Sequence, residues 1–503
     1  MNNSAMRRTV FLFFAIILTV CPEINSQEIK RLTLDEVIAL SETQSPNAMM
    51  ATHRFRSSYW EYRSSMAEFR PSLTLDGTLP DYARKYERHV SDSGKVSYVE
   101  TNTLQSYLSL SLSQNIGLTG GNLYLMSDLL RLDDLANNSF SFTDGKTEYT
   151  SHPISIGFKQ PILKYNELRW QKKIAPLKYE EAKKTYLSNI EAVHLTAVKY
   201  FFNLALAQIN IQIAEANMHN ADTLYKIAKG RYNLGPISEN ELLQMQLSYL
   251  NAGTAINEAQ INLRDSELKL RSFLGYNENV KIELIIPSEI PSLEVEMAQV
   301  LKYAEENNPD LIGFQRDILE AQSSVAKAKA EKGLSGDITA SYGLRQWGTR
   351  VPDAYKDPDD AQSVGLTFTL PIIDWGQGRG KYKMAKSALE LTQVQADQSR
   401  IDMLQQIMLD VQQFNLQDDQ VMIAAKSDTV AAKMFMVTKQ RFLIGKIDVL
   451  ELNNADTKKD SNRRAYIEAL NNYWTYFYNL RAVALFDFVK QKPLDADYRG
   501  LVK

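Results

Sequence analysis

The sequence predicts a mainly α-helical protein that is built from two tandem repeats and carries strands of a membrane β-barrel. Three observations support this fold class. One turn motif occurs twice, as RYNLGPISENELLQMQ (231–246) and RFLIGKIDVLELNNAD (441–456). Each copy follows a long segment in which apolar residues recur at steps of three and four, which is typical of a helix. Each half also contains short segments in which apolar and polar residues alternate, which is typical of strands.

The repeated turn motif keeps a common spacing. Gly235 and Gly445 each lie four residues after an arginine and six residues before a glutamate, Glu241 or Glu451. The two glycines are 210 residues apart, which is far longer than the unit of a solenoid repeat. We interpret each motif as a tight turn between two helices, at the same place in two copies of one half-molecule.

The N-terminus has the pattern of a secretory signal. Arg7 and Arg8 precede an apolar run from Val10 to Val20, and polar residues follow as far as Ser26. A run of this length is too short to span a membrane but suits the core of a signal peptide. We expect cleavage after Ser26. Whether Cys21 carries a lipid anchor is left open by the sequence.

Composition argues against several classes of function. The net charge is −3, so nothing predicts nucleic-acid binding. A single cysteine excludes an intrachain disulfide and a metal site made of several thiolates. The five histidines lack the spacing of a zinc motif, and no nucleophile–base pair is evident. We therefore predict no catalytic residues, no metal site, no cofactor and no enzymatic activity.

Strand-like segments follow the first helix of each repeat. Apolar residues alternate with small polar ones over 338–344 and 364–370 in the second repeat, and over 73–79 and 108–112 in the first. Lipid-facing barrel strands have this period, and so does a half-buried hairpin of a soluble protein. The signal peptide favours the membrane interpretation. The first repeat also has about 53 additional residues, in the strand-like region 104–160.

A long helix is expected after the strands of each repeat, over 177–234 and 381–444. After each turn the chain returns as a second helix, over 238–274 and 447–488. About 60 residues of helix make a rod of roughly 90 Å. Apolar residues of the first long helix recur at steps of three and four along two seams, which indicates coiled-coil packing with a neighbour on each side. A helical cylinder and an ordinary bundle both fit that pattern.

These elements define the expected organisation of the chain. It comprises a signal peptide (1–26), a first repeat (27–285), a linker (286–292), a second repeat (293–489) and a polar tail (490–503). The first repeat contains a helix, strands within 72–160 and the helices 177–234 and 238–274. The second contains a helix, strands within 336–373 and the helices 381–444 and 447–488.

Taken together, these motifs resemble those of the TolC-like outer membrane efflux protein family. The resemblance rests on four features: the duplicated first helices (LTLDEVIAL…SPN and LEVEMAQVLKYAEENNPD), the QPIL and LPIIDWG junctions at 160–163 and 370–376, the paired R-aromatic-x-x-G turns, and the duplicated halves. It covers nearly the whole chain after the signal peptide.

The resemblance implies a homotrimer. In this family β-hairpins of three chains form one 12-stranded barrel in the outer membrane, continuous with a long α-helical coiled-coil barrel in the periplasm. The implied function is a passive exit duct of a tripartite efflux or type I secretion system. Its partners would be outer-membrane lipid, a periplasmic adaptor (membrane fusion) protein and an inner-membrane RND or ABC transporter. The alternative function is a periplasmic coiled-coil scaffold or adaptor without a membrane barrel.

The resemblance also implies a gate at the helical turns, where carboxylates form rings and open when partner proteins engage. Glu241 and Glu451 occupy the matching positions, although solvated carboxylates at a helix N-terminus would look the same in sequence. Three residues further on, the family's second carboxylate is replaced by Gln244 and Asn454. We therefore expect a single acidic ring, with Glu451 the stronger candidate.

Two further expectations concern the latch and the membrane boundary. The family's polar latch falls on Phe442 and Ile447, which lack a hydroxyl and a charge, so we expect this latch to be absent or rebuilt. Aromatic residues near the strand ends suit a membrane-interface girdle: Tyr342, Trp347, Phe368 and Trp375. The additional residues of the first repeat are expected to elaborate a loop or plug rather than to add strands to the barrel.

Overall fold

A computed structural model describes residues 29–90, 94, 96–135, 147–235, 237–276 and 280–502. The expected signal peptide (1–26), with Cys21, lies outside these ranges. The chain divides into two compact units. The sheet unit consists of the described parts of 53–186, 304–406 and 495–503, and the helical unit of those of 1–52, 187–303 and 407–494. Both repeats contribute chain to each unit, and the units are described separately.

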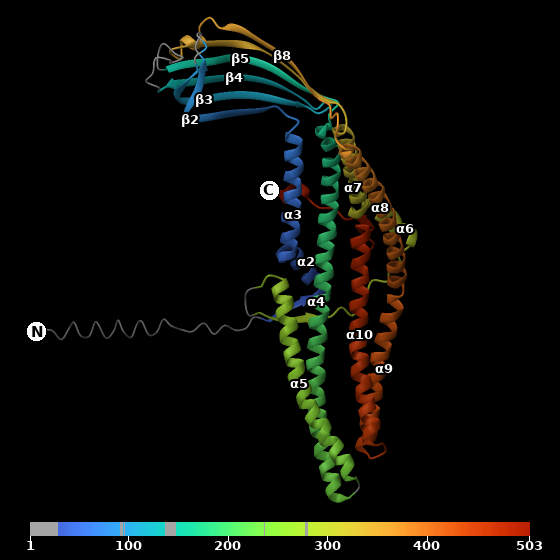
Figure 1. The fold of residues 1–503 in the computed structure, drawn as a ribbon. Helices are drawn as coiled ribbons and strands as arrows, with labels where there is room; N and C mark the ends of the chain where they lie inside the picture. The colour runs from blue at the N-terminus through green and yellow to red at the C-terminus, as the bar shows by residue number, and fades with distance from the viewer. Residues whose placement is uncertain are drawn as a thin grey trace, which may run out of the picture. The chain divides into compact units, whose positions relative to one another are not determined.

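The sheet unit is organised around six antiparallel strands (Figure 1). These are β2 (Ser72–Val90), β3 (Val96–Ile116), β4 (Gly121–Asp134), β5 (Thr147–Ile162), β7 (Ser335–Gly348) and β8 (Asp359–Thr369). Their order in the sheet is the order of the chain, so that β5 of the first repeat pairs with β7 of the second. The first repeat supplies four strands and the second supplies two.

The expected alternation of apolar and polar residues gives the sheet two different faces. One row of paired residues crosses five strands, from Leu73 through Leu112, Leu125 and Ile156 to Tyr342. All five side chains are exposed, by 39% to 65% of their surface. Because successive residues of a strand point to opposite faces, the small polar residues that alternate with them lie on the other face.

The expectation that the additional residues of the first repeat form a loop or plug is wrong. They form strands β4 and β5, which pair with β3 and β7 in the same sheet. The tight turn GLTG (117–120) makes this possible, since Gly120 adopts a positive φ of 76° and its backbone N–H donates to the carbonyl of Ile116 at 2.8 Å. The alternating pattern of the first two strands therefore continues through four.

Six α-helices contribute described residues to the sheet unit: α3 (Pro46–Ala67), α4 (Glu167–Leu234), the last residues of α6 (Met297–Asn307), α7 (Pro309–Glu331), α8 (Gln377–Asn415) and α11 (Tyr498–Val502). Helix α4 begins earlier than the expected residue 177, because the side chain of Asn166 accepts a hydrogen bond from the backbone N–H of Arg169 (3.0 Å) and caps its first turn. Helix α11 lies in the expected tail, and its Tyr498 ring packs 5.4 Å from that of Phe55.

The helical unit contains α2 (Leu34–Gln44), α5 (Glu239–Phe273), most of α6 (Met297–Asn307), α9 (Gln417–Leu443) and α10 (Val449–Ala484), with parts of α3, α4 and α8. Two short strand pairs complete it: β1 (Ile29–Thr33) with β6 (Lys281–Ile285), and β9 (Phe486–Asp487) with β10 (Lys492–Pro493).

The second long helix differs from the single helix expected over 381–444. It is interrupted at Leu416, between α8 and α9. Next to this break the side-chain amide of Asn415 bonds both the N–H and the C=O of Val295, at 3.1 and 3.0 Å. The interruption thus coincides with the attachment of the segment that begins the second repeat.

The predicted fold class is confirmed as a mainly helical chain with two repeats and a strand section. In each repeat two short helices precede the strands, and long helices with one turn follow them. None of the helices in the described ranges combines the length and the hydropathy of a membrane-spanning helix.

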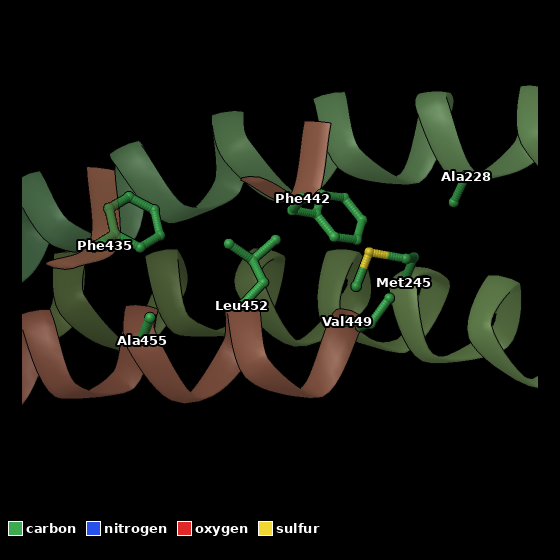
Figure 2. Close-up of a cluster of buried hydrophobic side chains, with 7 residues drawn as sticks. All are labelled: Ala228, Met245, Phe435, Phe442, Val449, Leu452 and Ala455. Atoms are coloured by element: carbon green, nitrogen blue, oxygen red, sulfur yellow. The ribbon is translucent and has the colours of Figure 1, made fainter. Parts of the chain in front are cut away.

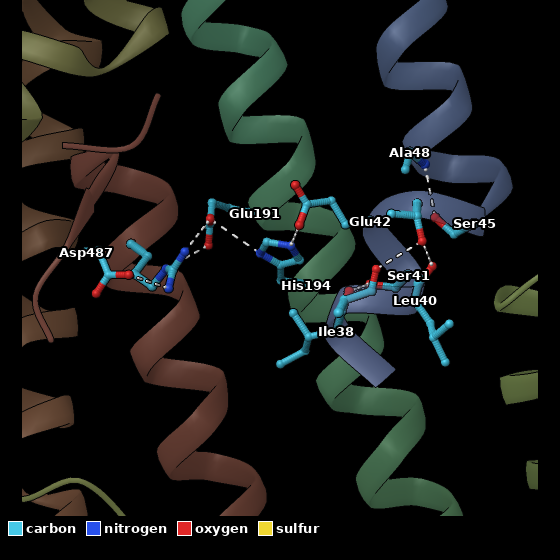
Figure 3. A network of polar contacts seen from close by, with 12 residues as sticks. Ile38, Leu40, Ser41, Glu42, Ser45, Ala48, Glu191, His194 and Asp487 are labelled. Carbon is cyan, nitrogen blue, oxygen red and sulfur yellow. Dashed lines mark hydrogen bonds and ion pairs between the residues drawn. The ribbon is translucent and has the colours of Figure 1, made fainter. Parts of the chain in front are cut away.

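A buried charge network joins the two repeats inside the helical unit (Figure 3). Arg481 of α10 donates two hydrogen bonds to Glu191 of α4, at 2.9 and 3.1 Å, and a third to Asp487 at 3.1 Å. His194 lies beside this pair, with its ring nitrogens 3.3 Å from Glu191 and 3.8 Å from Glu42 of α2. Burial disfavours the imidazolium, but the two carboxylates outweigh burial and raise the pKa of His194.

Removing one partner of the central pair should destabilise the protein strongly. The side chains of Glu191 and Arg481 are only 3% and 14% exposed. The substitution Glu191→Gln therefore leaves a buried guanidinium without the carboxylate that neutralises it, and it should lower the free energy of unfolding by about 3 kcal/mol. Thermal unfolding of the purified protein measures this loss. Asp222→Asn, which breaks the exposed Lys226–Asp222 pair, is the control and should change little. Equal effects of the two substitutions would contradict a structural role for the network.

Stability should also fall as the pH rises above neutrality. The raised pKa of His194 means that the folded state holds a proton which the unfolded chain releases near its ordinary pKa of about 6.5. The stabilisation is therefore complete below about pH 6.5 and disappears as the pH rises through the higher folded-state value. Unfolding temperatures measured from pH 6 to pH 9 should decline more for the native protein than for His194→Gln. Parallel curves for both proteins would show that His194 does not titrate in this window.

Candidate gate at the helical turns

Both copies of the turn motif are tight turns between helices. The chain passes from α4 to α5 at Gly235 and from α9 to α10 at Gly445. The glycines have φ values of 92° and 76°, in the left-handed region that side chains other than glycine rarely adopt. Each glycine N–H donates to a carbonyl three residues earlier, that of Tyr232 (3.0 Å) or Phe442 (2.9 Å). This is how glycine commonly ends a helix.

The two motif glutamates differ in what their carboxylates do. Glu241 belongs to a capping box: its carboxylate accepts hydrogen bonds from the N–H and the hydroxyl of Ser238, at 2.7 and 2.8 Å. At Glu451 the cap is Asp448, whose side chain accepts from the Glu451 N–H at 2.8 Å. The Glu451 side chain is exposed, as is that of Asn454 one turn further on. Glu451 therefore presents its charge to solvent, whereas Glu241 uses its carboxylate to cap α5.

The two helical turns share one apolar core (Figure 2). It consists of Ala228, Met245, Phe435, Phe442, Val449, Leu452 and Ala455, contributed by α4, α5, α9 and α10. Phe442 is 6% exposed, and Ile447 packs against the cluster from its edge. We call these residues the tip cluster. Phe442 and Ile447 thus serve to hold the two hairpins of one chain together.

A latch missed in the sequence joins the same hairpins. The guanidinium of Arg231, on α4, donates to the main-chain carbonyl of Leu443 at 2.8 Å and lies 5.8 Å from the ring of Phe442. The arginine of the repeated motif was visible in the sequence, but its acceptor is a backbone carbonyl of the other repeat. No side-chain pattern encodes such a partner.

Polar contacts continue along the helices above the turns. Asn210, Asn217 and Asn220 of α4 bond Arg464, Asp460 and Lys439 of the second repeat, at 2.7, 2.6 and 2.7 Å. Beside them burial raises the pKa of Asp456, although Lys459 lies 2.5 Å away. A polar connection between the hairpins therefore exists, built on asparagines and Arg231 rather than on the two expected latch positions.

The expected interface aromatics lie in the sheet unit. Tyr342 and Phe368 are 53% and 68% exposed, and both belong to the apolar face of the sheet. Trp347 lies five residues beyond Tyr342 on β7, at a position of the opposite face. Trp375 lies in the turn after β8 and is 95% exposed. Among the residues that the structure describes, no cluster of three or more potential ligands could hold a metal ion.

The repeated helical hairpins and the antiparallel strand section are the architecture of solved outer-membrane channels. The chain belongs to the outer membrane efflux protein family, whose model matches residues 128–276 and 300–484. It is accordingly a protein of the outer membrane that extends into the periplasm. Members of this family are passive efflux channels that form trimers and work with adaptors and inner-membrane pumps.

Solved channels of low sequence identity share the fold. The CmeC outer membrane channel of Campylobacter jejuni is 15% identical, with a TM-score of 0.65 over 93% of this chain and 88% of that one. The outer membrane protein VceC of Vibrio cholerae is 14% identical, with a TM-score of 0.62 over 92% and 97%. The open MtrE channel of Neisseria gonorrhoeae is 13% identical, with a TM-score of 0.60 over 92% and 91%. No curated protein sequence matches the chain.

Truncating the central ring of the tip cluster should loosen both turns at once. Phe442→Ala removes a buried side chain and should cost about 3–5 kcal/mol locally. Amide hydrogen exchange should accelerate by at least about 100-fold around both turns, 228–246 and 438–456, although the residue lies in only one of them. Leu443→Ala is the matched control, because the Leu443 side chain is 43% exposed and only its main-chain carbonyl takes part in the latch, as the acceptor for Arg231. Acceleration confined to the second turn would contradict a shared core.

Proposed function

We propose that this chain forms the homotrimeric exit duct of a tripartite efflux or secretion system, closed at its helical turns and opened by partner proteins. Exposed apolar seams on the helices support assembly with further copies. Ile423, Val430 and Val437 of α9 recur at seven-residue steps and are 56% to 64% exposed. A sustained heptad spacing is the signature of a coiled-coil seam, and within the chain these side chains remain at the surface.

Exposed apolar residues of α8 also occur at heptad spacing. Met384 and Leu391 lie seven residues apart, and so do Ile401 and Met408, with exposures of 43% to 70%. Large apolar side chains at this spacing favour burial against helices of a neighbouring copy, since solvent contact at each of them is unfavourable. These exposed seams are the structural observation that supports assembly into a trimeric duct. Membership of the efflux family supports the same assembly.

The gate operates between copies rather than within one copy. The tip cluster and the Arg231 contact hold the two turns of a chain together, so the pair moves as one body. Contacts between neighbouring pairs are the ones that separate when the duct opens. Three copies of Glu451 form a negative collar at the narrow end, which favours cations and repels anions.

Partners supply the energy and the opening signal. A periplasmic adaptor engages the helical turns, and an inner-membrane pump of the RND or ABC type delivers the cargo. The channel itself performs no chemistry. Membership of a family of outer-membrane channels supports this proposal over a periplasmic scaffold without a membrane portion. A soluble periplasmic protein, instead of a heat-modifiable oligomer in outer-membrane fractions, would overturn it.

The collar makes the two glutamates experimentally distinguishable. In planar bilayers, Glu451→Gln should reduce the preference of the channel for cations several-fold, because it removes three charges from one ring. Glu241→Gln is the matched control from the other repeat, since the Glu241 carboxylate is engaged by Ser238. It should leave ion selectivity unchanged. If both substitutions alter selectivity equally, or neither does, the assignment of the collar to Glu451 is wrong.

A further inference from the structure

The strand section of this chain is larger than the resemblance implied. A 12-stranded barrel made by three copies takes four strands from each, whereas the sheet of this chain has six among the described residues. The surplus is one antiparallel hairpin in the first repeat, and it lies inside the sheet, not beside it. What the added hairpin does depends on whether its two faces match those of the other strands.

The apolar face continues without interruption through the added strands. Leu123 and Leu125 of β4 and Ile154 and Ile156 of β5 are 39% to 49% exposed, as expected for side chains that face lipid. Leu125 is paired with Leu112 of β3 on one side and with Ile156 on the other. A plug inside a barrel would face water or polar side chains, and an exposed apolar face would be unfavourable there.

Charged residues of the same strands lie on the opposite face. Asp76, Ser109, Asp128 and His152 form one row of paired residues across β2 to β5. The His152 ring bonds the Asp128 carboxylate at 2.8 Å, and Asp128 is 7% exposed. This polar face is suited to the lumen of a barrel, because barrel strands alternate apolar residues outside with polar residues inside.

The two edge strands of the sheet, β2 and β8, can pair with each other between neighbouring copies. Neither β2 nor β8 has a second partner among the described strands. Six alternating strands make β2 and β8 run in opposite directions, so β8 of one copy can pair with β2 of the next in the antiparallel manner of the rest of the sheet. Open edges with unpaired backbone groups are not tolerated in lipid, and closing the sheet removes them.

We propose that three copies close an eighteen-stranded barrel, with six strands from each copy and a β8–β2 junction between neighbours. The inference rests on the proposed trimeric duct. Barrel diameter grows roughly linearly with strand number, so the membrane passage is about 1.5 times as wide as in a 12-stranded barrel. Barrels of 16–18 strands leave an open aqueous channel, which suits large hydrated cargo.

The junction is confined to the first part of β2. Strands of 9–11 residues span a membrane, and β8 has 11 residues, whereas β2 has 19. The pairing of β2 with β3 is irregular between Thr78 and Asp81. Beyond this point the strand is charged, and Arg84 bonds Glu100 of β3 at 2.7 Å. Residues 72–78 are therefore the part of β2 that pairs with β8 of the neighbour.

Cysteine cross-linking in the intact, membrane-inserted protein tests the junction. Thr74→Cys is combined in turn with Ser363→Cys and with Thr367→Cys, all three on the polar face of the sheet. On oxidation, at least one pair should convert the monomer band on denaturing gels into covalent dimers and trimers, and reduction should reverse this. The unsubstituted chain, whose single cysteine is Cys21, controls for other disulfides.

A second pair distinguishes the competing closure. If β2 and β3 stay outside a 12-stranded barrel, β4 becomes the edge, and Met126→Cys should cross-link to Thr367→Cys of the neighbour. Cross-links through Met126 but not through Thr74, or twelve strands in an image of the purified trimer, would overturn the inference and leave the duct intact. Absence of a membrane-inserted trimer would instead refute the proposed function, and the eighteen-stranded barrel with it.

Discussion

Two repeats in one chain must be held together by contacts that neither repeat can make alone. In the helical unit the central contact of this kind is the buried pair of Arg481 and Glu191. A buried ion pair adds little net stability, but loss of one partner is costly, so the pair fixes how the second repeat is placed against α4. The tip cluster repeats this arrangement with apolar side chains, where Phe442 packs among residues of both hairpins.

Duplication has left two turns with the same backbone but different chemistry. Both need glycine, because the chain reverses through a left-handed conformation at Gly235 and Gly445. Their glutamates have diverged because the caps differ. A serine cap engages Glu241 reciprocally, whereas the aspartate cap at Asp448 accepts only the backbone N–H of Glu451. One residue at the cap thus decides whether a glutamate caps its own helix or leaves its carboxylate exposed to solvent.

Local patterns in the sequence predicted the helices, the turns and the alternating strands, because each depends on neighbouring residues. Contacts between distant segments were not accessible in the same way. The latch of Arg231 has a backbone carbonyl as its partner, and Asn210, Asn217 and Asn220 look like ordinary surface residues of a long helix. The segments of β4 and β5 alternate in the sequence with the same two faces as β2 and β3. The expectation of a loop or plug for them depends on the strand number that the resemblance implies and not on these residues, and it is wrong for that reason.

The number of strands that can be added to such a chain is constrained by its connections. Helix α3 leads into β2, and β5 leads into α4, so four antiparallel strands bring the chain back to the end of the sheet at which it entered. A single added strand would leave the chain at the opposite end of the sheet and separate β5 from α4. A hairpin is the smallest insertion that preserves both connections, and it keeps β5 antiparallel to β7. An inserted hairpin therefore adds two strands to the sheet of each copy, while the helices of the proposed gate keep their order in the chain.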